Sequence, residues 1–287
     1  MRIGPHEVGL RPIVIAEIGL NHCGSMERAI EMIHAAKSAG CDIAKFQTFT
    51  AIDVCPPDQV WTYRSQGEMV TEHRIDIFKR CELPEAAWPI LKAECERQGI
   101  LFMSTPETPA DLALLLKVGI PAVKVASDNA TNMPMLRACA RSGLPVILST
   151  GMCNLTEVAG AILTQWDGLR AVLVCSSEYP CPPESANLSR ITTLRKISAS
   201  IPVGFSDHTE GTTAAVTAVG LGACIFETHF TLSRDLPGPD HWWAKTPDEL
   251  GRWARDIRAA EAMMGSGLMA PSAAERAVKA AYQRAVA

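Results

Sequence analysis

The stretch PVGFSDHTEGTTAAVTAVGLGACIFETHF, residues 202–230, contains two β-forming runs separated by an apolar stretch with helical spacing. The runs are Pro202–Phe205 and Ala223–Phe230. Each has a polar cluster at or just past its carboxyl end. A strand, a helix and a second strand in this order predict one repeat of an α/β fold, with its polar residues gathered at one edge.

Both polar clusters contain a histidine: His208 follows the first run, and His229 ends the second, two residues after Glu227. Period-two alternation places Glu227 and His229 on one side of the strand, where burying them is costly unless a charge satisfies them. A divalent cation would do so, and the pattern therefore predicts a metal site at His208 and His229. Alternatively, one histidine caps a helix and the other is hydrogen-bonded in the core. The two loops hold several polar residues: Ser206, Asp207, His208, Asp240 and His241.

Working outward, the same strand–helix alternation covers most of the chain. Six further strands are expected at 13–18, 42–49, 100–105, 122–127, 145–150 and 170–177. Helices are expected at 25–39, 84–98, 110–117, 133–141, 155–165, 188–199, 212–221 and 247–264. Eight strands and eight helices in about 250 residues fit a (β/α)8 TIM barrel in count and length.

A doubly wound open sheet is the alternative architecture. Polar residues end nearly every expected strand: Glu17, Lys45, Gln47, Ser104, Thr105, Lys124, Ser127, Ser149, Thr150, Ser176, Ser177, Ser206 and His229. In a closed barrel these ends converge on one mouth, whereas an open sheet spreads them along an edge. We therefore expect a single TIM-barrel domain over residues 1–287, with one site.

Composition limits the class of partner and the compartment. The chain has 287 residues, 47% hydrophobic content and a net charge of −4, without a long basic run, which argues against nucleic acid and anionic membranes. Ten cysteines occur without a CxxC pair and are expected to be reduced core residues. No signal peptide or membrane-spanning run is recognisable, which favours a soluble cytoplasmic protein.

Two regions fall outside the repeat. Residues 49–84 form a long polar connection without a clean period, and such connections are more often functional lids than random insertions. Trp61, Tyr63 and Arg64 within it are candidates to cover the mouth, although a solvated surface excursion fits as well. Residues 265–287 form a C-terminal tail.

Lys45 and Lys124 lie inside strand runs, where an ammonium needs an anion or water to be tolerated. Hydroxyls from Thr105, Ser127 and Ser149 surround them in the predicted mouth, although strand-end hydroxyls also cap helices. No P-loop or GxGxxG follows a strand. The pattern favours a small phosphorylated acid over a nucleotide.

Several motifs, in order, resemble those of the sialic acid synthase family. They are IAEIGLNHCG, KFQTF, STP, KVASDNATNMPML, PVILSTGM, SSEYPCP, GFSDHT and ETHFTLSRDLPGPDH, between about residues 13 and 250. The resemblance implies a (β/α)8 barrel that joins phosphoenolpyruvate to an open-chain N-acetylhexosamine, typically N-acetylmannosamine, and releases phosphate. It also implies a divalent metal, expected to be manganese, with magnesium or cobalt as alternatives.

The resemblance assigns roles by motif. Phosphoenolpyruvate would be held by Lys45, Thr105, Lys124, Ser127, Ser149 and Ser206. Glu17 would be the catalytic carboxylate, with His208 and Asp240 also in catalysis and His208 and His229 on the metal. The sugar would meet Gln47, Tyr179 and Asp240, with Ser177 as a further candidate. Arg284, in AYQRAVA, would lie over the phosphate.

Two departures from the family concern the acceptor. Family members usually continue into an antifreeze-like domain that reaches the partner's sugar pocket in a homodimer, and no such domain is expected within this sequence. The family's NHNG reads NHCG here, with Cys23 beside the expected sugar. We therefore expect either a different aldehyde, held in part by residues 49–84, or a separate antifreeze-like subunit.

Two competing functions remain open at this stage. A pyruvate-type aldolase would form a Schiff base through Lys45 or Lys124, which requires an apolar site that lowers the lysine pKa. A non-catalytic phosphoenolpyruvate-binding scaffold would not need Glu17 or the histidines, all of which are present.

Overall fold

The computed structural model describes residues 1–286 except 166 and 199, and side chains as far as residue 282. Within them, eight parallel strands form a closed barrel in the order β10-β11-β12-β3-β4-β7-β8-β9. Their bounds are β3 Ile13–Gly19, β4 Ile43–Thr48, β7 Leu101–Pro106, β8 Val123–Val125, β9 Val146–Ser149, β10 Leu169–Cys175, β11 Val203–Asp207 and β12 Ile225–His229. The predicted TIM barrel is confirmed, and the open-sheet alternative is wrong.

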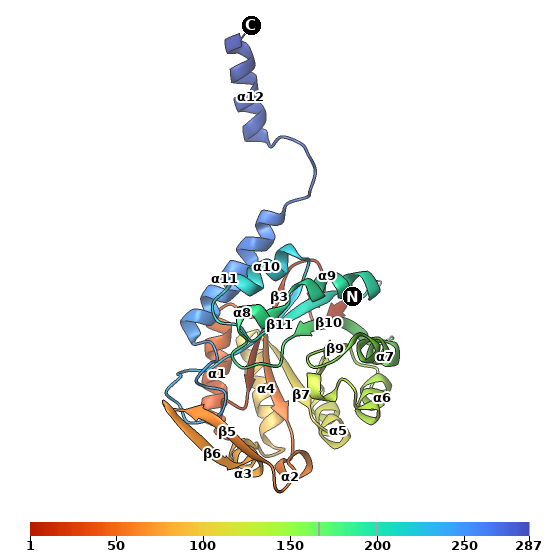
Figure 1. The fold of residues 1–287 in the computed structure, drawn as a ribbon, viewed down its shortest axis with the longest axis vertical. Helices are drawn as coiled ribbons and strands as arrows, with labels where there is room; N and C mark the ends of the chain where they lie inside the picture. The colour runs from red at the N-terminus through yellow and green to blue at the C-terminus, as the bar shows by residue number, and fades with distance from the viewer. Residues whose placement is uncertain (166, 199, 287) are drawn as a thin grey trace.

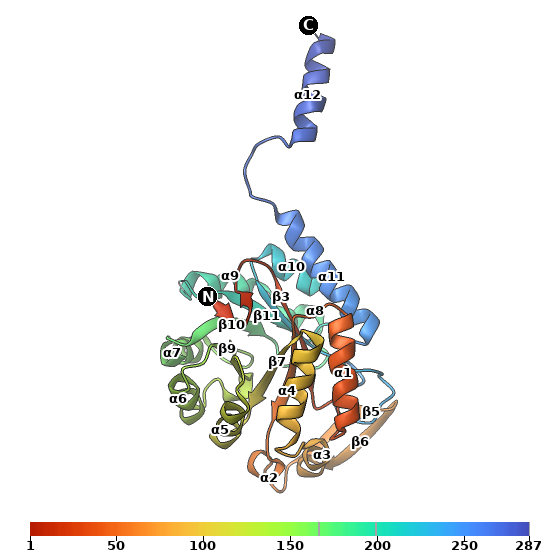
Figure 2. The same cartoon turned by 180° about the vertical axis from the view of Figure 1, so that it is seen from behind.

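A ring of helices covers the barrel, as Figures 1 and 2 show from opposite sides. The ring contains α1 Met26–Ser38, α4 Ala87–Gln98, α5 Pro109–Val118, α6 Met133–Arg141, α7 Leu155–Gln165, α9 Ser189–Ile197, α10 Thr213–Gly220 and α11 Pro247–Met264, with α8 Pro183–Ala186 as a short extra turn. Capping boxes at Thr108 and Thr246 fix the starts of α5 and α11. The ends agree with the expected ones within about two or three residues, the usual uncertainty of helix termini.

An N-terminal ribbon closes the end of the barrel where the strands begin. Strands β1 (Arg2–Ile3) and β2 (His6–Glu7) pair antiparallel. Ile3 is fully buried and packs with Val8 against the lower interior residues of the barrel, such as Ile13 and Ile225. Apolar side chains therefore fill this half of the barrel, and the polar residues are left to the other half.

Residues 49–84 are regular rather than irregular, which corrects the expectation for this segment. It contains α2 (Ala51–Val54), the antiparallel hairpin of β5 (Val60–Ser65) and β6 (Glu68–His73), and α3 (Arg74–Cys81). Gln66 and Gly67 both have positive φ, 51° and 87°, as the two-residue turn of a hairpin requires.

The hairpin tip is bound to the loop that follows β12. Gln66 Nε2 donates to the carbonyl of Asp235 at 2.9 Å, and the backbone N–H of Gly238 donates to Ser65 Oγ at 3.2 Å. The guanidinium carbon of Arg64 lies 5.9 Å from the centre of the Trp242 ring. The hairpin and the β12 loop therefore form a joined rim over one side of the barrel.

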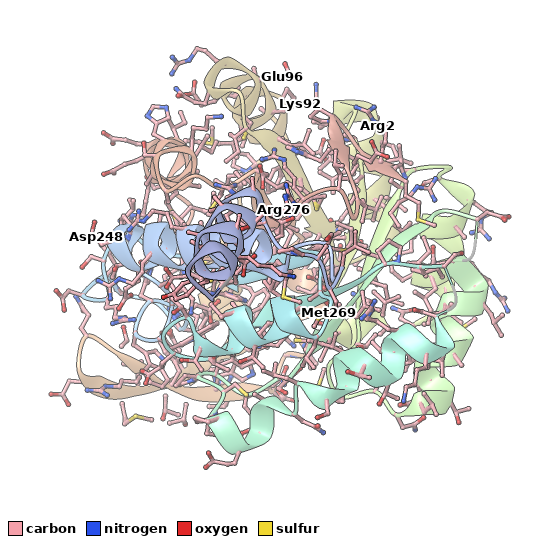
Figure 3. All side chains as sticks on the ribbon, turned by 90° about the horizontal axis from the view of Figure 1, so that it is seen from above. Arg2, Lys92, Glu96, Asp248, Met269 and Arg276 are labelled. Atoms are coloured by element: carbon pink, nitrogen blue, oxygen red, sulfur yellow. The ribbon has the colours of Figure 1, made fainter. Side chains whose placement is uncertain are left out.

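The hairpin and the last helix, α12 (Ala273–Val286), lie at opposite ends of the molecule in Figures 1 and 2. Figure 3, viewed from the α12 end, shows Lys92 and Glu96 on the outer side of α4, where Lys92 Nζ lies 2.7 Å from Glu96 Oε1. In the part of the chain that the structure describes, no helix has both the length and the apolar character needed to cross a membrane.

Candidate active site

A cavity of about 530 Å³ opens at the carboxyl ends of the barrel strands. It is lined by every predicted site residue with a described side chain: Glu17, Lys45, Gln47, Thr105, Lys124, Ser127, Ser149, Ser177, Tyr179, Ser206, His208, His229 and Asp240. Arg284 is on α12, and its side chain lies outside the described residues. The structure brings the other residues together, while their roles stay predictions.

Lys45 lies at the floor of the cavity, between carboxylates and a hydroxyl. Its Nζ is 2.7 Å from Glu17 Oε2 and 3.8 Å from Glu227 Oε2, and it donates to Thr105 Oγ1 at 3.0 Å. Gln47 Nε2 donates to the other oxygen of Glu17 at 2.9 Å. Burial raises the pKa of Glu17, and the neighbouring ammonium offsets this rise only in part.

Lys124 forms the second half of the floor. Its Nζ donates to Ser149 Oγ at 2.7 Å and lies 3.6 Å from Glu227 Oε1, which also accepts from Ser206 Oγ at 3.3 Å. Burial lowers the pKa of Lys124, although the charge of Glu227 opposes the shift. Two ammonium groups thus supply the charge that the burial of Glu227 was expected to require, so this carboxylate gives no separate support for a metal.

A hydroxyl pair lies beside the lysines where Gly151 passes close to the site. The Gly151 N–H donates to Ser127 Oγ at 2.9 Å. A Cβ at this position would lie 2.4 Å from Ser177 Oγ and 2.8 Å from Ser127 Oγ. Ser177 Oγ has no hydrogen-bond partner within the described residues. Glycine therefore keeps open a space in which hydroxyl and amide donors converge, as an oxyanion requires.

The two histidines face each other across the other wall, with ring centres 5.5 Å apart. The ring Nδ1 of His208 and the carbonyl oxygen of Ser176 are 2.7 Å apart, which assigns the proton to Nδ1 and leaves a lone pair on Nε2. His229 Nδ1 lacks a hydrogen-bond partner in the described structure and lies 3.4 Å from Asp240 Oδ2. These two imidazoles fit the nitrogen ligands of a divalent cation, although no group of three His, Cys, Asp or Glu side chains converges within the described ranges.

Two polar residues from the predicted loops serve the structure instead of facing the cavity. Asp207 accepts from Trp253 Nε1 at 2.8 Å and from Thr209 N–H at 2.9 Å, because it is on the outward side of β11. His241 is buried and contacts Thr231 and Cys23.

Sequence reasoning missed three charged groups that line the cavity, Arg74, Glu107 and Asp128. The Arg74 guanidinium lies 4.8 Å from the Trp61 ring centre and 4.7 Å from that of Phe78. The expected lid residues Trp61 and Tyr63 also line the cavity. Arg64 does not, because strand alternation places it on the opposite face of β5.

Comparison with known proteins assigns the chain to a family. A model of the NeuB family matches residues 32–269. The chain belongs to the NeuB family. Sialic-acid-type synthases of this family condense phosphoenolpyruvate with a sugar.

Relatives of this NeuB chain include synthases for different sugar acids. It is 36% identical over 292 residues to the N,N'-diacetyllegionaminic acid synthase of Legionella pneumophila, covering 99% of this chain and 82% of the relative. It is 32% identical over 259 residues to human N-acetylneuraminate-9-phosphate synthase, covering 88% and 71%. The structure of an N-acetylneuraminic acid synthetase from Leptospira borgpetersenii in complex with citrate superimposes with a TM-score of 0.88 at 29% identity, covering 99% and 96%.

Proposed function

We propose that this chain condenses phosphoenolpyruvate with an N-acylated amino-sugar aldehyde, giving a 3-deoxy-2-ulosonic acid of the sialic or legionaminic type and phosphate. The observation that carries this proposal is the cavity floor, where two buried lysines and a set of hydroxyls lie next to Glu17 and below an imidazole pair. The named relatives support the product class.

Phosphoenolpyruvate binds at the floor of the cavity. Lys45 and Lys124 attract its carboxylate and phosphate, and the hydroxyls of Thr105, Ser149 and Ser206 supply directed donors. Ser127 and the unpartnered Ser177 add two further donors beside Gly151. Orienting the enol face of the substrate in this way supplies several kcal/mol of the rate acceleration, of the order found for positioned reactants.

The acceptor lies above phosphoenolpyruvate, against Gln47, Tyr179 and Asp240 on the barrel, Trp61 on the hairpin and Arg74 at the start of α3. His208 and His229 hold a divalent metal, which we propose to be manganese, with magnesium or cobalt able to replace it. When bound, the metal supplies Lewis-acid stabilisation of developing oxygen charge.

Glu17 acts as a general base during the condensation. Carbon 3 of phosphoenolpyruvate bonds to the aldehyde carbon, whose oxygen takes up a proton and becomes a hydroxyl. Water then adds to carbon 2, giving a tetrahedral centre that expels phosphate. Glu17, held by Lys45 and Gln47, accepts the proton of that water. Burial raises the pKa of Glu17, which makes its carboxylate a stronger base than an exposed glutamate.

The test is phosphate release from phosphoenolpyruvate with a panel of N-acetylated hexosamines and unmodified aldoses, before and after removal of metal by a chelator. We expect release with an acylamino sugar, lost on metal removal and restored by manganese. Release that is independent of the sugar contradicts condensation, and full turnover by protein with less than about one metal per ten chains contradicts the metal. The homodimer and the cytoplasmic location stay predictions.

The lowered pKa of Lys124 supports a second candidate, a Schiff-base aldolase acting on pyruvate. Borohydride treatment with pyruvate distinguishes the two. A stable adduct on Lys124 supports the aldolase, whereas phosphoenolpyruvate consumption without an adduct supports the synthase. The ion pair between Lys124 and Glu227 favours the synthase, because the charge of Glu227 stabilises the ammonium form and opposes the effect of burial.

A further inference from the structure

Cys23 lies outside the cavity, in a cluster that the proposed condensation does not use. Its Sγ is 3.2 Å from His241 Nε2 and 3.3 Å from the carbonyl oxygen of Pro237. His241 Nδ1 is in turn 2.7 Å from Thr231 Oγ1, which fixes the orientation of the ring. A thiol, an imidazole and an orienting hydroxyl in a row form the arrangement that activates a cysteine nucleophile.

A second cysteine lies beside the first. Cys81, the last residue of α3, interacts electrostatically with Cys23. The two backbones touch there, because a Cβ on Gly24 would lie 2.4 Å from the carbonyl oxygen of Arg80. Both cysteines are free, Cys81 is buried, and Cys23 is half-buried. One cysteine is therefore accessible and the other is shielded, adjacent to it.

The surroundings favour the thiolate at Cys23 and the thiol at Cys81. The interaction with Cys81, together with the contact with His241 and against the effect of burial, lowers the pKa of Cys23 to about 5. The pKa of Cys81 is raised by the same interaction and by burial. Cys23 is thus suited to attack an oxidant, and Cys81 to complete the reaction.

We propose that Cys23 and Cys81 form a thiol switch in which peroxide oxidation of Cys23, followed by a disulfide to Cys81, disturbs the active-site rim. The Cys23 thiolate attacks a peroxide oxygen, breaking the O–O bond and giving a sulfenic acid and hydroxide. The hydroxide takes the Cys81 proton, and the resulting thiolate displaces hydroxide from the sulfenic sulfur. Two thiols and one hydrogen peroxide yield one disulfide and two waters.

The link reaches the site through the loop after β12. Oxidation removes the contacts of Cys23 with Pro237 and His241, which attach this loop to the segment after β3. The same loop carries Asp240 and Trp243 into the cavity. We therefore expect the disulfide to reduce turnover of the proposed condensation, on which this consequence rests, and a thiol reductant to restore it.

The first test needs no activity. Limiting iodoacetamide at pH 6.5 should label Cys23 about tenfold or more faster than Cys153 and Cys224, which are also half-buried but lack a histidine contact. In a separate sample that has not been alkylated, hydrogen peroxide should produce a disulfide between tryptic peptides 3–28 and 81–92, each containing one of the two cysteines. Equal labelling rates, or a link from Cys23 to any other cysteine, would overturn the proposal.

Variants separate the roles of the two cysteines. Cys81→Ser should leave a sulfenic acid on Cys23 that reacts with dimedone, and His241→Gln should slow labelling of Cys23. Cys55→Ser, in the same apolar cluster as Cys81, is the matched control and should still form the link. Peroxide should inhibit the wild type and Cys55→Ser, but not in the presence of reductant. A mapped link without lost turnover overturns the switch, whereas a reduced protein inactive with every sugar contradicts only the proposed function.

Discussion

Glu17 is a buried carboxylate whose position is fixed by a partner on each oxygen. It is 1% exposed, ion-paired with Lys45 on one oxygen and hydrogen-bonded by Gln47 on the other. An amide at this position keeps the shape of the side chain and its hydrogen bond from Gln47, but it cannot accept a proton.

We expect Glu17→Gln to lower kcat by about 10²–10⁴-fold, the contribution of a lost acid–base group, with phosphoenolpyruvate affinity changed far less. Phosphate-release kinetics and calorimetric titration measure the two quantities. The control is Glu31→Gln on the exposed side of α1, which should behave as wild type. Near-normal turnover of Glu17→Gln would remove this carboxylate from the mechanism.

Glu107 carries a charge that the cavity tolerates poorly. Burial, with the nearby charge of Asp128, raises the pKa of Glu107 from 4.5 to about 8. Between these pH values the unfolded chain has released this proton and the folded chain has kept it. The contribution of Glu107 to stability therefore decreases as the pH rises through that window.

Glu107→Gln should accordingly reduce the loss of stability that the wild type shows as the pH rises. At pH 5 the variant and the wild type should unfold at similar temperatures, and at pH 8 the variant should be the more stable. Thermal unfolding of the metal-free protein in matched buffers measures this difference. Identical pH profiles for the two proteins would show that Glu107 ionises freely in the folded state.

The β5–β6 hairpin is the element most closely tied to the choice of acceptor. Its Trp61 and Tyr63 line the cavity, as does Arg74, the first residue of α3 directly after the hairpin, while Arg64 lies over the Trp242 ring. Arg74 Nη1 donates to Gln59 Oε1 at 2.9 Å, while its Nε has no hydrogen-bond partner within the described residues. An N-acyl carbonyl oxygen on the sugar is a suitable partner for this guanidinium.

Arg74→Met should raise the KM of the acceptor about tenfold or more, the effect of losing a charged hydrogen bond of about 1.5–3 kcal/mol. The KM of phosphoenolpyruvate should change little, because the proposed function places that substrate at the floor, away from Arg74. Arg64→Met is the matched control, on strand β5 of the neighbouring hairpin. Equal effects of the two variants on the acceptor would contradict the placement of Arg74.

The same hairpin shows why sequence reasoning succeeded in some places and failed in others. The barrel strands are continuous apolar runs such as IVIAEI, and the polar residue at the end of each predicts the mouth. The hairpin has only weak alternation, with a Gln-Gly turn in place of the usual Asn-Gly. The alternation along β5 does predict that Trp61 and Tyr63 share one face of the strand and that Arg64 is on the other. Arg74 comes after the hairpin, and only the packing of α3 brings it back over Trp61.

At the scale of the whole molecule, the barrel has a closed end and an open end. The closed end depends on the β1–β2 ribbon, whose Ile3 is 0% exposed and packs in the lower core. Nothing in the expected strand–helix series required this ribbon, because its strands have two residues each.

Ile3→Ala should lower the free energy of unfolding by about 2–5 kcal/mol, the cost of a large-to-small change in a core. Urea denaturation measures this loss, and phosphoenolpyruvate binding to the folded variant should be unchanged. Ile90→Ala, at a 54% exposed position of α4, is the control and should shift stability by less than about 0.5 kcal/mol. A similar loss in both variants would show that the ribbon is dispensable.

The open end imposes an order on the two substrates. Lys45 and Lys124 are each 2% exposed at the floor, and the joined rim of hairpin and β12 loop stands above them. A sugar held against Trp61 would block the path to the lysines. Phosphoenolpyruvate therefore has to enter first, and steady-state kinetics should follow an ordered sequential scheme. An unreactive alditol of the acceptor should then inhibit uncompetitively against phosphoenolpyruvate, whereas random entry would give noncompetitive inhibition.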